Sequence, residues 1–279
     1  MRHGLEVIDE IRGLRVSGFT LTEIVNHTKI AKSTILPYIN NIPLSAYLKE
    51  KIRLAKLDGQ RRGATSRRGI SIKNYSFLTP EKWNVDMVNL VAHFLFDGSI
   101  TRTSCIYYNR SEILVNMMAC KMRDLLQVSD YKTYTTPEGV KRVSYHNVEI
   151  ATFIRRKAGE LLEYIPKDSR EHKISFLKAF FDDEGSVGFS RKKRRVRGYQ
   201  HSIEILTLIK GLLKDLDIES VIDNRNVEIS ITRKENLLKF QKLINFTPGL
   251  CVNGNRSNSV WKKDLEKREI LQMAIGSYL

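Results

Sequence analysis

The sequence predicts an α+β fold: two tandem αββαββα repeats that follow a small all-α N-terminal region. Three observations predict this fold class. A short string that begins at Leu90 is echoed by one that begins at Leu177, and the segments after each copy run through helical and strand-like patterns in a similar order. The first 44 residues, in contrast, carry only helical patterns. An internal repeat on this scale indicates two halves of similar structure.

The N-terminal residues 1–44 predict a helix-turn-helix. Apolar residues recur at helical spacing over residues 5–14, and Thr20 or Thr22 can cap a short second helix. After a turn, Lys32-Ser33-Thr34 opens a third helix that reaches about Asn40. A small helical hairpin that serves only as an interaction cap is the alternative.

Pro37 lies inside the expected third helix and is tolerated if Ser33 or Thr34 caps that helix, since it then lies within or just after the first turn. We interpret the three helices as a DNA-binding helix-turn-helix, and we expect Lys32, Ser33 and Thr34 to contact DNA.

Residues 45–80 are expected to form a basic linker. The chain from Ser45 to Asn74 is rich in Lys and Arg and looks turn-prone, so its cations can follow a phosphate backbone. A solvated linker without a partner is the alternative. The linker residues expected to contact DNA are Arg61, Arg62, Arg67 and Arg68.

The rest of the chain divides into two similar halves, residues 81–168 and residues 169–279. In the first half the expected elements are a buried helix to residue 96, strands within 100–108, a helix over 111–126, a hairpin around 137–139 and a helix over 148–164. In the second half they are a helix to residue 184, strands at 187–189 and 201–206, a helix over 208–216, a turn at 223–226, a strand over 227–231 and a helix over 234–244.

Each copy of the repeated string ends in an acid followed by glycine, Asp97-Gly98 and Glu184-Gly185. We expect each glycine to end its helix in a left-handed conformation. A carboxylate is disfavoured at the negative end of a helix, and two such acids raise each other's pKa. A bound divalent cation removes both penalties, so the pattern predicts a paired acidic metal site.

The two strings resemble the LAGLIDADG motif of homing endonucleases in its two-motif, single-chain form. The matching positions are Leu90, Ala92, Asp97 and Gly98 in the first copy, and Leu177, Ala179, Asp182, Glu184 and Gly185 in the second. The sequence departs from the motif at His93, Leu95 and Lys178. The resemblance implies a pseudo-symmetric DNA-binding saddle whose two motif helices pack closely through Ala92, Gly98, Ala179 and Gly185.

The resemblance also implies an activity: a monomeric, site-specific double-strand endonuclease that hydrolyses phosphodiester bonds at a long asymmetric site with Mg²⁺ or Mn²⁺. Asp97 and Glu184 then bind the metal, and the backbone carbonyls of Phe96 and Asp183 are candidates for further ligands.

In that family a polar or basic residue at the end of the second strand of each half orders the water network. Asn109 and Arg110 occupy this place in the first half. In the second half the expected strand puts Thr207 and Leu208 there, which predicts a weaker second centre.

The formal net charge of +16, from 47 basic and 31 acidic residues, agrees with a polyanionic partner such as double-stranded DNA. No apolar stretch approaches a transmembrane span and no signal peptide is recognisable, so we expect a cytoplasmic protein without membrane contact. Residues expected to contact DNA in the two halves are Arg102, Lys132, Lys141, Arg142, Arg191, Lys192, Lys193, Arg194, Arg195, Arg197 and Arg225.

Two alternative functions stay open. A catalytically weak or inactive transcription regulator would keep the saddle and the helix-turn-helix, and Leu208 favours it. An RNA maturase would use the same surface on structured RNA. The acids at both motif ends favour the nuclease, and a gene placed inside an intron would favour the nuclease or the maturase.

Overall fold

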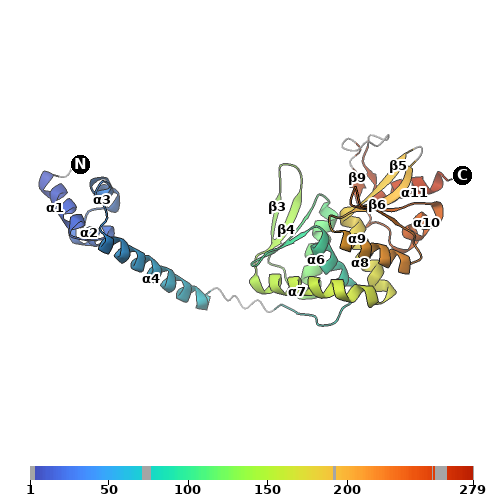
Figure 1. Ribbon diagram of the computed structural model, residues 1–279, viewed down its shortest axis with the longest axis horizontal. Coiled ribbons are helices and arrows are strands. Elements are labelled where there is room, and N and C mark those ends of the chain that lie inside the picture. Colours follow the sequence, from blue (N-terminus) through green and yellow to red (C-terminus); the bar gives the residue numbers. More distant parts are fainter. Residues whose placement is uncertain (1–3, 71–76, 191–192, 253, 255–262, 279) are drawn as a thin grey trace. The chain divides into compact units, whose positions relative to one another are not determined.

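The computed structural model describes residues 4–70, 77–190, 193–252, 254 and 263–278, with only the backbone of residues 61–70 included. The chain forms two compact units, residues 1–76 and residues 77–279. Each unit is built around its own apolar core. Most of the helices and several of the strands are labelled in Figure 1.

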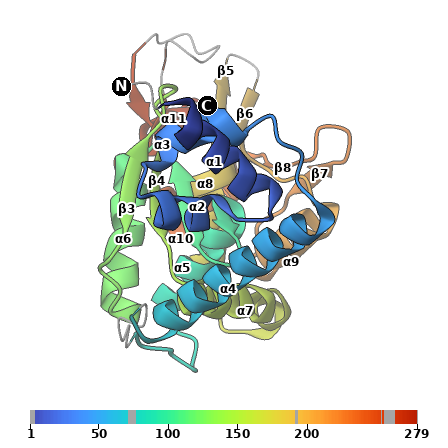
Figure 2. The same cartoon turned by 90° about the vertical axis from the view of Figure 1, so that its left-hand side faces the viewer.

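The N-terminal unit begins with three short helices, α1 (Leu5–Val16), α2 (Leu21–Thr28) and α3 (Lys32–Ile39). The three helices lie against one another (Figure 2). Four buried isoleucines form their core, one from α1, one from α2 and two from α3. Only three residues separate α2 from α3, as in a helix-turn-helix. The predicted three-helix arrangement is therefore present.

Local sequence explains the ends of these helices. Thr20 caps α2: its Oγ1 accepts the Glu23 amide, and the Glu23 carboxylate accepts the Thr20 amide in return. The N-cap of α3 is Ala31, so the expected cap by Ser33 or Thr34 is wrong. Pro37 consequently lies beyond the first turn of α3, where its missing N–H removes one helical hydrogen bond.

Helix α4 (Ala46–Ile70) occupies most of the segment that was expected to be turn-prone. That expectation is wrong for a chemical reason. The segment contains no proline, and its Lys, Arg, Ala and Leu residues are strong helix formers. Ser45 supports the start of α4, because its Oγ accepts the Leu48 amide at 3.2 Å.

The first repeat of the second unit has the order αββαββα. Its elements are α5 (Val85–Phe96), β1 (Gly98–Ile100), β2 (Cys105–Asn109), α6 (Glu112–Leu126), β3 (Lys132–Thr135), β4 (Lys141–Tyr145) and α7 (Val148–Tyr164). The four strands form an antiparallel sheet in the order β1-β2-β4-β3. A short 3₁₀ helix, η1 (Ile165–Lys167), leads into the second repeat.

The second repeat has the same order of elements and the same sheet. Its elements are α8 (Arg170–Glu184), β5 (Gly185–Ser190), β6 (Lys193–Tyr199), α9 (Ile203–Asp215), β7 (Val221–Asp223), β8 (Glu228–Ile231) and α10 (Lys234–Leu243). The strand order is β5-β6-β8-β7, the counterpart of the first sheet. The predicted α+β fold with two tandem repeats is confirmed.

One strand of the second repeat was predicted in the wrong place. Residues 201–206 do not form a strand: β6 lies earlier and contains the basic residues Lys193, Arg194, Arg195 and Arg197, and α9 begins at Ile203. Ser202 caps α9 by accepting the Ile205 amide at 3.3 Å. This basic segment can form a strand because Arg195 and Arg197 alternate with buried Val196 and Gly198.

The motif helices α5 and α8 pack directly against each other in a core that both repeats share. Ala92 and Ala179 are fully buried there. Neither Gly98 nor Gly185 has a positive φ, so the expected left-handed caps are wrong. Glycine is needed for space, because a Cβ would lie 2.2 Å from the Phe94 carbonyl oxygen at Gly98 and 2.1 Å from that of Phe181 at Gly185.

A C-terminal extension follows the second repeat. Strand β9 (Cys251–Val252) pairs with β10 (Leu265–Glu266), and α11 (Lys267–Gly276) packs on β5, β6 and α10. None of the helices in the described part of the chain has the length and apolar character that crossing a membrane requires.

Candidate active site and nucleic-acid interface

Two acids lie at matched ends of the motif helices. Asp97 is the C-cap of α5, and Glu184 is the last residue of α8. Burial raises the pKa of Asp97 to about 7, with a further contribution from the charge of Asp183. Burial likewise raises the pKa of Glu184 to about 7, and the charges of Asp97 and Asp183 add to it. The two acids therefore repel within one partly buried site.

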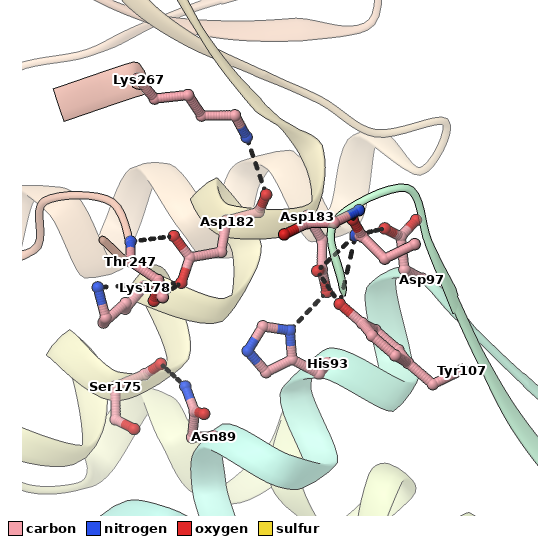
Figure 3. A network of polar contacts seen from close by, with 12 residues as sticks. Asn89, His93, Asp97, Tyr107, Ser175, Lys178, Asp182, Asp183, Thr247 and Lys267 are labelled. Atoms are coloured by element: carbon pink, nitrogen blue, oxygen red, sulfur yellow. Dashed lines mark hydrogen bonds and ion pairs between the residues drawn. The ribbon is translucent and has the colours of Figure 1, made fainter. Parts of the chain in front are cut away.

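Asp183 connects the two repeats at this site (Figure 3). Its side chain is fully buried, and one of its oxygens lies 2.8 Å from His93 Nδ1 on α5. The other oxygen accepts the Tyr107 hydroxyl proton from β2 at 2.6 Å. Burial raises the pKa of Asp183, although His93 and Tyr107 oppose the shift. His93, a departure from the motif, thus gains a structural explanation.

Asn109 holds Asp97 in place. Its Nδ2 donates to Asp97 Oδ2 at 2.8 Å, and its Oδ1 accepts the Ser111 amide at 2.9 Å. The side chain is thus fixed from both ends at the start of α6. Arg110, the other residue expected here, is exposed, and its charge acts on Glu138 at the tip of the β3–β4 hairpin.

The counterpart of Asn109 in the second repeat is Gln200. Each of these residues lies two positions before the serine that is the N-cap of the following helix, Ser111 or Ser202. Gln200 Oε1 accepts the Ser202 amide at 3.4 Å, which repeats the bond that Asn109 makes. The second repeat therefore has a polar residue at the end of its second strand.

The expectation that Thr207 and Leu208 occupy that place is wrong, so Leu208 gives no reason to expect a weaker second centre. Both residues lie on α9, where Leu208 packs against the core. The exposed His201 follows Gln200 as Arg110 follows Asn109, and its ring lies 3.2 Å from the Tyr199 hydroxyl.

Asp182 links the motif helix to the C-terminal extension. Its carboxylate accepts the Thr247 amide at 2.8 Å and the Thr247 hydroxyl at 2.6 Å. Lys178, one turn earlier on α8, lies 3.9 Å from the same carboxylate. Lys178, whose charge is unusual for this helix, thus lies close to the buried Asp182 carboxylate. A buried carboxylate needs such a compensating charge or hydrogen bond.

Sequence reasoning missed Lys267, which comes from the C-terminal extension. Its Nζ donates to the backbone carbonyl of Asp182 at 2.9 Å. Burial lowers the pKa of Lys267, and the four neighbouring acids oppose that shift. The only sequence signal was the helix start at Glu266, whose capping box with Glu269 places Lys267 at the first helical position.

The donor set fits a hard divalent cation. Asp97 and Glu184 provide carboxylate oxygens whose raised pKa values reflect a charge that such a cation neutralises. Mg²⁺ uses one or two carboxylates and keeps several waters. Within the residues that the structure covers, no group of three or more His, Cys, Asp and Glu side chains is arranged so that it could hold a metal ion. The ring of Phe96 packs on Phe176 and Phe180.

The outer face of the second sheet is basic. Lys193, Arg195 and Arg197 alternate along β6 and share one face, where both arginines pair with Glu228 of β8. Arg194 points to the other face and donates to the Ser277 carbonyl at 3.0 Å. Arg225 is exposed in the β7–β8 turn. Arg191 and Lys192 lie outside the described residues.

The first sheet also separates its predicted DNA contacts. Lys132 and Arg142 share a face, and the Arg142 guanidinium lies 4.6 Å from the centre of the Tyr134 ring. Lys141 lies on the opposite face and forms an ion pair with Glu112 of α6. Arg102 is exposed in the β1–β2 turn.

In the N-terminal unit, the predicted DNA contacts lie on two helices. Lys32 and Ser33 are exposed in the first turn of α3, and Thr34 is half-buried. The backbone positions of the four expected linker arginines belong to α4: Arg61, Arg62, Arg67 and Arg68.

Comparisons with known proteins give one family match and several similar structures. Residues 171–245, which run from α8 to just beyond α10, match the family model described as LAGLIDADG-like domain. A structure of mesophilic variants of the homing endonuclease I-DmoI is 16% identical, with a TM-score of 0.46 over 60% of this chain and 96% of that one. Comparison with curated protein sequences gives no match.

Two further structures are similar to a comparable extent. I-DmoI in complex with DNA and Ca is 16% identical, with a TM-score of 0.45 over 58% of this chain and 91% of that one. The N-terminal LAGLIDADG domain of DUF199/WhiA is 17% identical, with a TM-score of 0.46 over 61% of this chain and 88% of that one.

Proposed function

Because this chain carries a LAGLIDADG-like domain, we propose that it is a metal-dependent, site-specific double-strand DNA endonuclease. One observation carries the proposal. Two acids from equivalent helix ends, Asp97 and Glu184, share a site in which burial and the charges of neighbouring carboxylates raise both pKa values to about 7. Perturbed carboxyls of this kind are typical of catalytic sites.

In the proposed reaction Asp97 and Glu184 hold Mg²⁺ or Mn²⁺ with their ionised carboxylates. A cation held there would supply an activated water and would neutralise charge at the phosphate and at the leaving oxygen. Asn109 fixes the rotamer of Asp97, which keeps the first acid in one position throughout the reaction. Gln200 has the corresponding place in the second repeat and shares with Asn109 the bond to the N-cap serine, but it does not bond Glu184.

Asp183 has a different role in this proposal. Its carboxylate is occupied by His93 and Tyr107, so it aligns the two motif helices instead of binding metal through its side chain. Phe96 and Asp183 retain their backbone carbonyls as candidate ligands beside the two acids.

The outer faces of the two sheets are the proposed DNA surface. Lys132 and Arg142 on the first sheet and Lys193, Arg195 and Arg197 on the second face away from the helices. Basic and aromatic side chains on alternate strand positions can reach phosphates and base edges in the major groove. We propose that the helix-turn-helix and α4 lengthen the contact with DNA, and that the protein acts as a monomer.

A DNA-binding regulator without nuclease activity is the second candidate. One observation favours it: the acids have protein partners already, since Asn109 bonds Asp97 and the Lys267 ammonium is attracted to all four acids. A regulator would need these acids only to join the two repeats.

Cleavage of a library of DNA duplexes in Mg²⁺ tests the proposal. We expect the native protein to cut both strands at one site, whereas Asp97→Asn and Glu184→Gln bind the site but cut at least about a hundredfold more slowly. Glu163→Gln, which changes an exposed acid on α7, is the matched control and should cut normally. DNA binding without cleavage by the native protein would favour the regulator, and binding only to structured RNA would favour a maturase.

A further inference from the structure

The acidic site contains one lysine that belongs to neither repeat. Lys267 Nζ lies 2.9 Å from the backbone carbonyl oxygen of Asp182 and 5.2 Å from the centre of the Phe246 ring. The ammonium therefore contacts the end of α8 directly, within one turn of Glu184. A lysine is seldom placed among core residues unless its charge is compensated.

Four carboxylates provide the compensation. The ammonium is attracted most strongly to Asp182 and Asp183, and then to Asp97 and Glu184. Three of these acids also accept hydrogen bonds from other side chains: Asp182 from Thr247, Asp183 from Tyr107 and Asp97 from Asn109. In the part of the chain that the structure covers, no side chain donates a hydrogen bond to Glu184.

Backbone and capping hydrogen bonds of the C-terminal extension fix the position of Lys267. Strand β10 pairs with β9 just before it, and the Lys267 amide donates to the Leu250 carbonyl at 2.7 Å. The Glu266 carboxylate accepts the Gly249 amide at 2.9 Å and also closes the capping box of α11. Thr247, near the start of the same extension, binds Asp182 as well. The extension thus holds the end of α8 at two points.

We propose that Lys267 is the resident counter-ion of the acidic site. Its positive charge offsets the repulsion among the acids when no divalent cation is bound. The same charge repels an incoming cation, so Lys267 stabilises the metal-free protein and lowers its affinity for metal. The second part rests on the proposed metal-dependent function, whereas the first part does not.

The counter-ion role is tested without metal or DNA, by thermal unfolding of the full chain in EDTA at pH 8. We expect Lys267→Met to lower Tm, and we expect Glu184→Gln to raise the Tm of the Lys267→Met protein by more than it raises that of the native protein. Lys267→Arg keeps the charge and should retain most of the native stability. Lys239→Met is the matched control, because Lys239 also donates to a backbone carbonyl, that of Asp217, but lies away from the acids.

This double-mutant cycle separates a charge effect from a packing effect. If Glu184→Gln raises Tm equally in both backgrounds, Lys267 acts through packing alone and the counter-ion role is overturned. If Lys267→Met leaves Tm unchanged, the role is overturned as well.

The effect on metal affinity is tested by titrating each variant with Mn²⁺ in a calorimeter. We expect Lys267→Met to bind Mn²⁺ on the order of tenfold more tightly than the native protein, since one repelling charge is removed at close range. Equal or weaker binding by Lys267→Met would overturn this part. Absence of Mn²⁺ binding from every variant would count against the metal-dependent function and against the proposed effect of Lys267 on metal affinity. The unfolding cycle would still decide the counter-ion role.

Discussion

At the scale of single residues, the four acids of the site differ in burial and in their hydrogen-bond partners. Asp182 and Asp183 are the most buried, and both are held by hydrogen bonds, to Thr247 in one case and to Tyr107 and His93 in the other. Asp97 and Glu184 are half-buried; Asn109 donates to Asp97, whereas in the described part of the chain no side chain donates a hydrogen bond to Glu184. The three consecutive acids of α8 therefore lie in three different environments.

The raised pKa values of Asp97 and Glu184 predict how stability depends on pH. Each carboxyl has a pKa of about 7 when folded, above its ordinary value near 4, so between these limits the folded state binds more protons than the unfolded state. Their contribution to stability is present below about pH 4 and is lost as pH rises through 7. In EDTA, we expect the decrease in Tm from pH 5 to pH 8 to be smaller for Asp97→Asn and Glu184→Gln than for the native protein.

Glu163→Gln serves as the control for this pH series, because it removes one exposed carboxyl outside the site. A native-like pH dependence in both site variants would contradict the assignment. The same protonation predicts that metal binding strengthens as pH rises through 7, since a metal ligand must be deprotonated.

The pairing of Asn109 with Gln200 makes a second prediction at this scale. Asn109→Ala removes the donor to Asp97, whereas Gln200→Ala removes only the acceptor of the Ser202 amide. We expect Asn109→Ala to slow cleavage of one DNA strand by about tenfold, because residues that orient metal ligands commonly have effects of this size, and we expect Gln200→Ala to slow cleavage of the other strand less. Nicking assays with each strand labelled measure this; Leu208→Met should leave both rates unchanged.

At the scale of elements, the ends of the two motif helices are determined by close packing. Gly98 and Gly185 each follow an acid, and each leaves no room for a side chain above the preceding helical turn. The backbone at these positions is ordinary in φ, so the requirement is steric. The helix end and the acid are thus positioned by the same glycine.

We therefore expect Gly98→Ala and Gly185→Ala to destabilise the second unit by roughly 3 kcal/mol or more, since a backbone carbonyl cannot move aside as a flexible side chain can. Gly211→Ala is the matched control, because Gly211 lies within α9 with open space around its Cα. Alanine there should stabilise the helix by about 0.5–1 kcal/mol. Urea unfolding measures all three, and a loss below about 1 kcal/mol at Gly98 would contradict the steric argument.

At the scale of the whole molecule, the chain consists of two units with separate cores. The proposed catalytic acids all belong to residues 77–279, whereas the helix-turn-helix and the basic helix α4 belong to residues 1–76. The proposed catalytic site therefore lies in one unit, and part of the proposed DNA-binding surface lies in the other.

A fragment of residues 77–279 tests this division, once circular dichroism has shown that it folds. We expect it to cut the same DNA site as the full chain but to bind it more weakly. The slope of log affinity against log salt should also be smaller, by roughly 0.9 for each phosphate contact that residues 1–76 provide. An unchanged affinity and slope would show that the N-terminal unit does not touch the site.

Sequence patterns predicted much of this arrangement. The two acids, the repeat order and the helix-turn-helix helices follow from local signals: a doubled motif, periodic apolar residues, and caps such as Thr20. Prediction failed where a segment carries two signals at once. The second strand of this repeat was expected at residues 201–206, beyond the basic residues of β6, although buried Val196 and Gly198 alternate there with Arg195 and Arg197.

The sequence by itself determined the fold class and the two acids, since both depend on residues close together in the chain. Tertiary structure alone decided what surrounds those acids. His93 and Tyr107 reach from the first repeat to Asp183, the neighbour of Glu184, and Lys267 arrives from an extension that shares no motif with either repeat. The physical reason is that a pKa or a counter-ion depends on distance in space, and no local pattern reports which distant side chain fills a buried position.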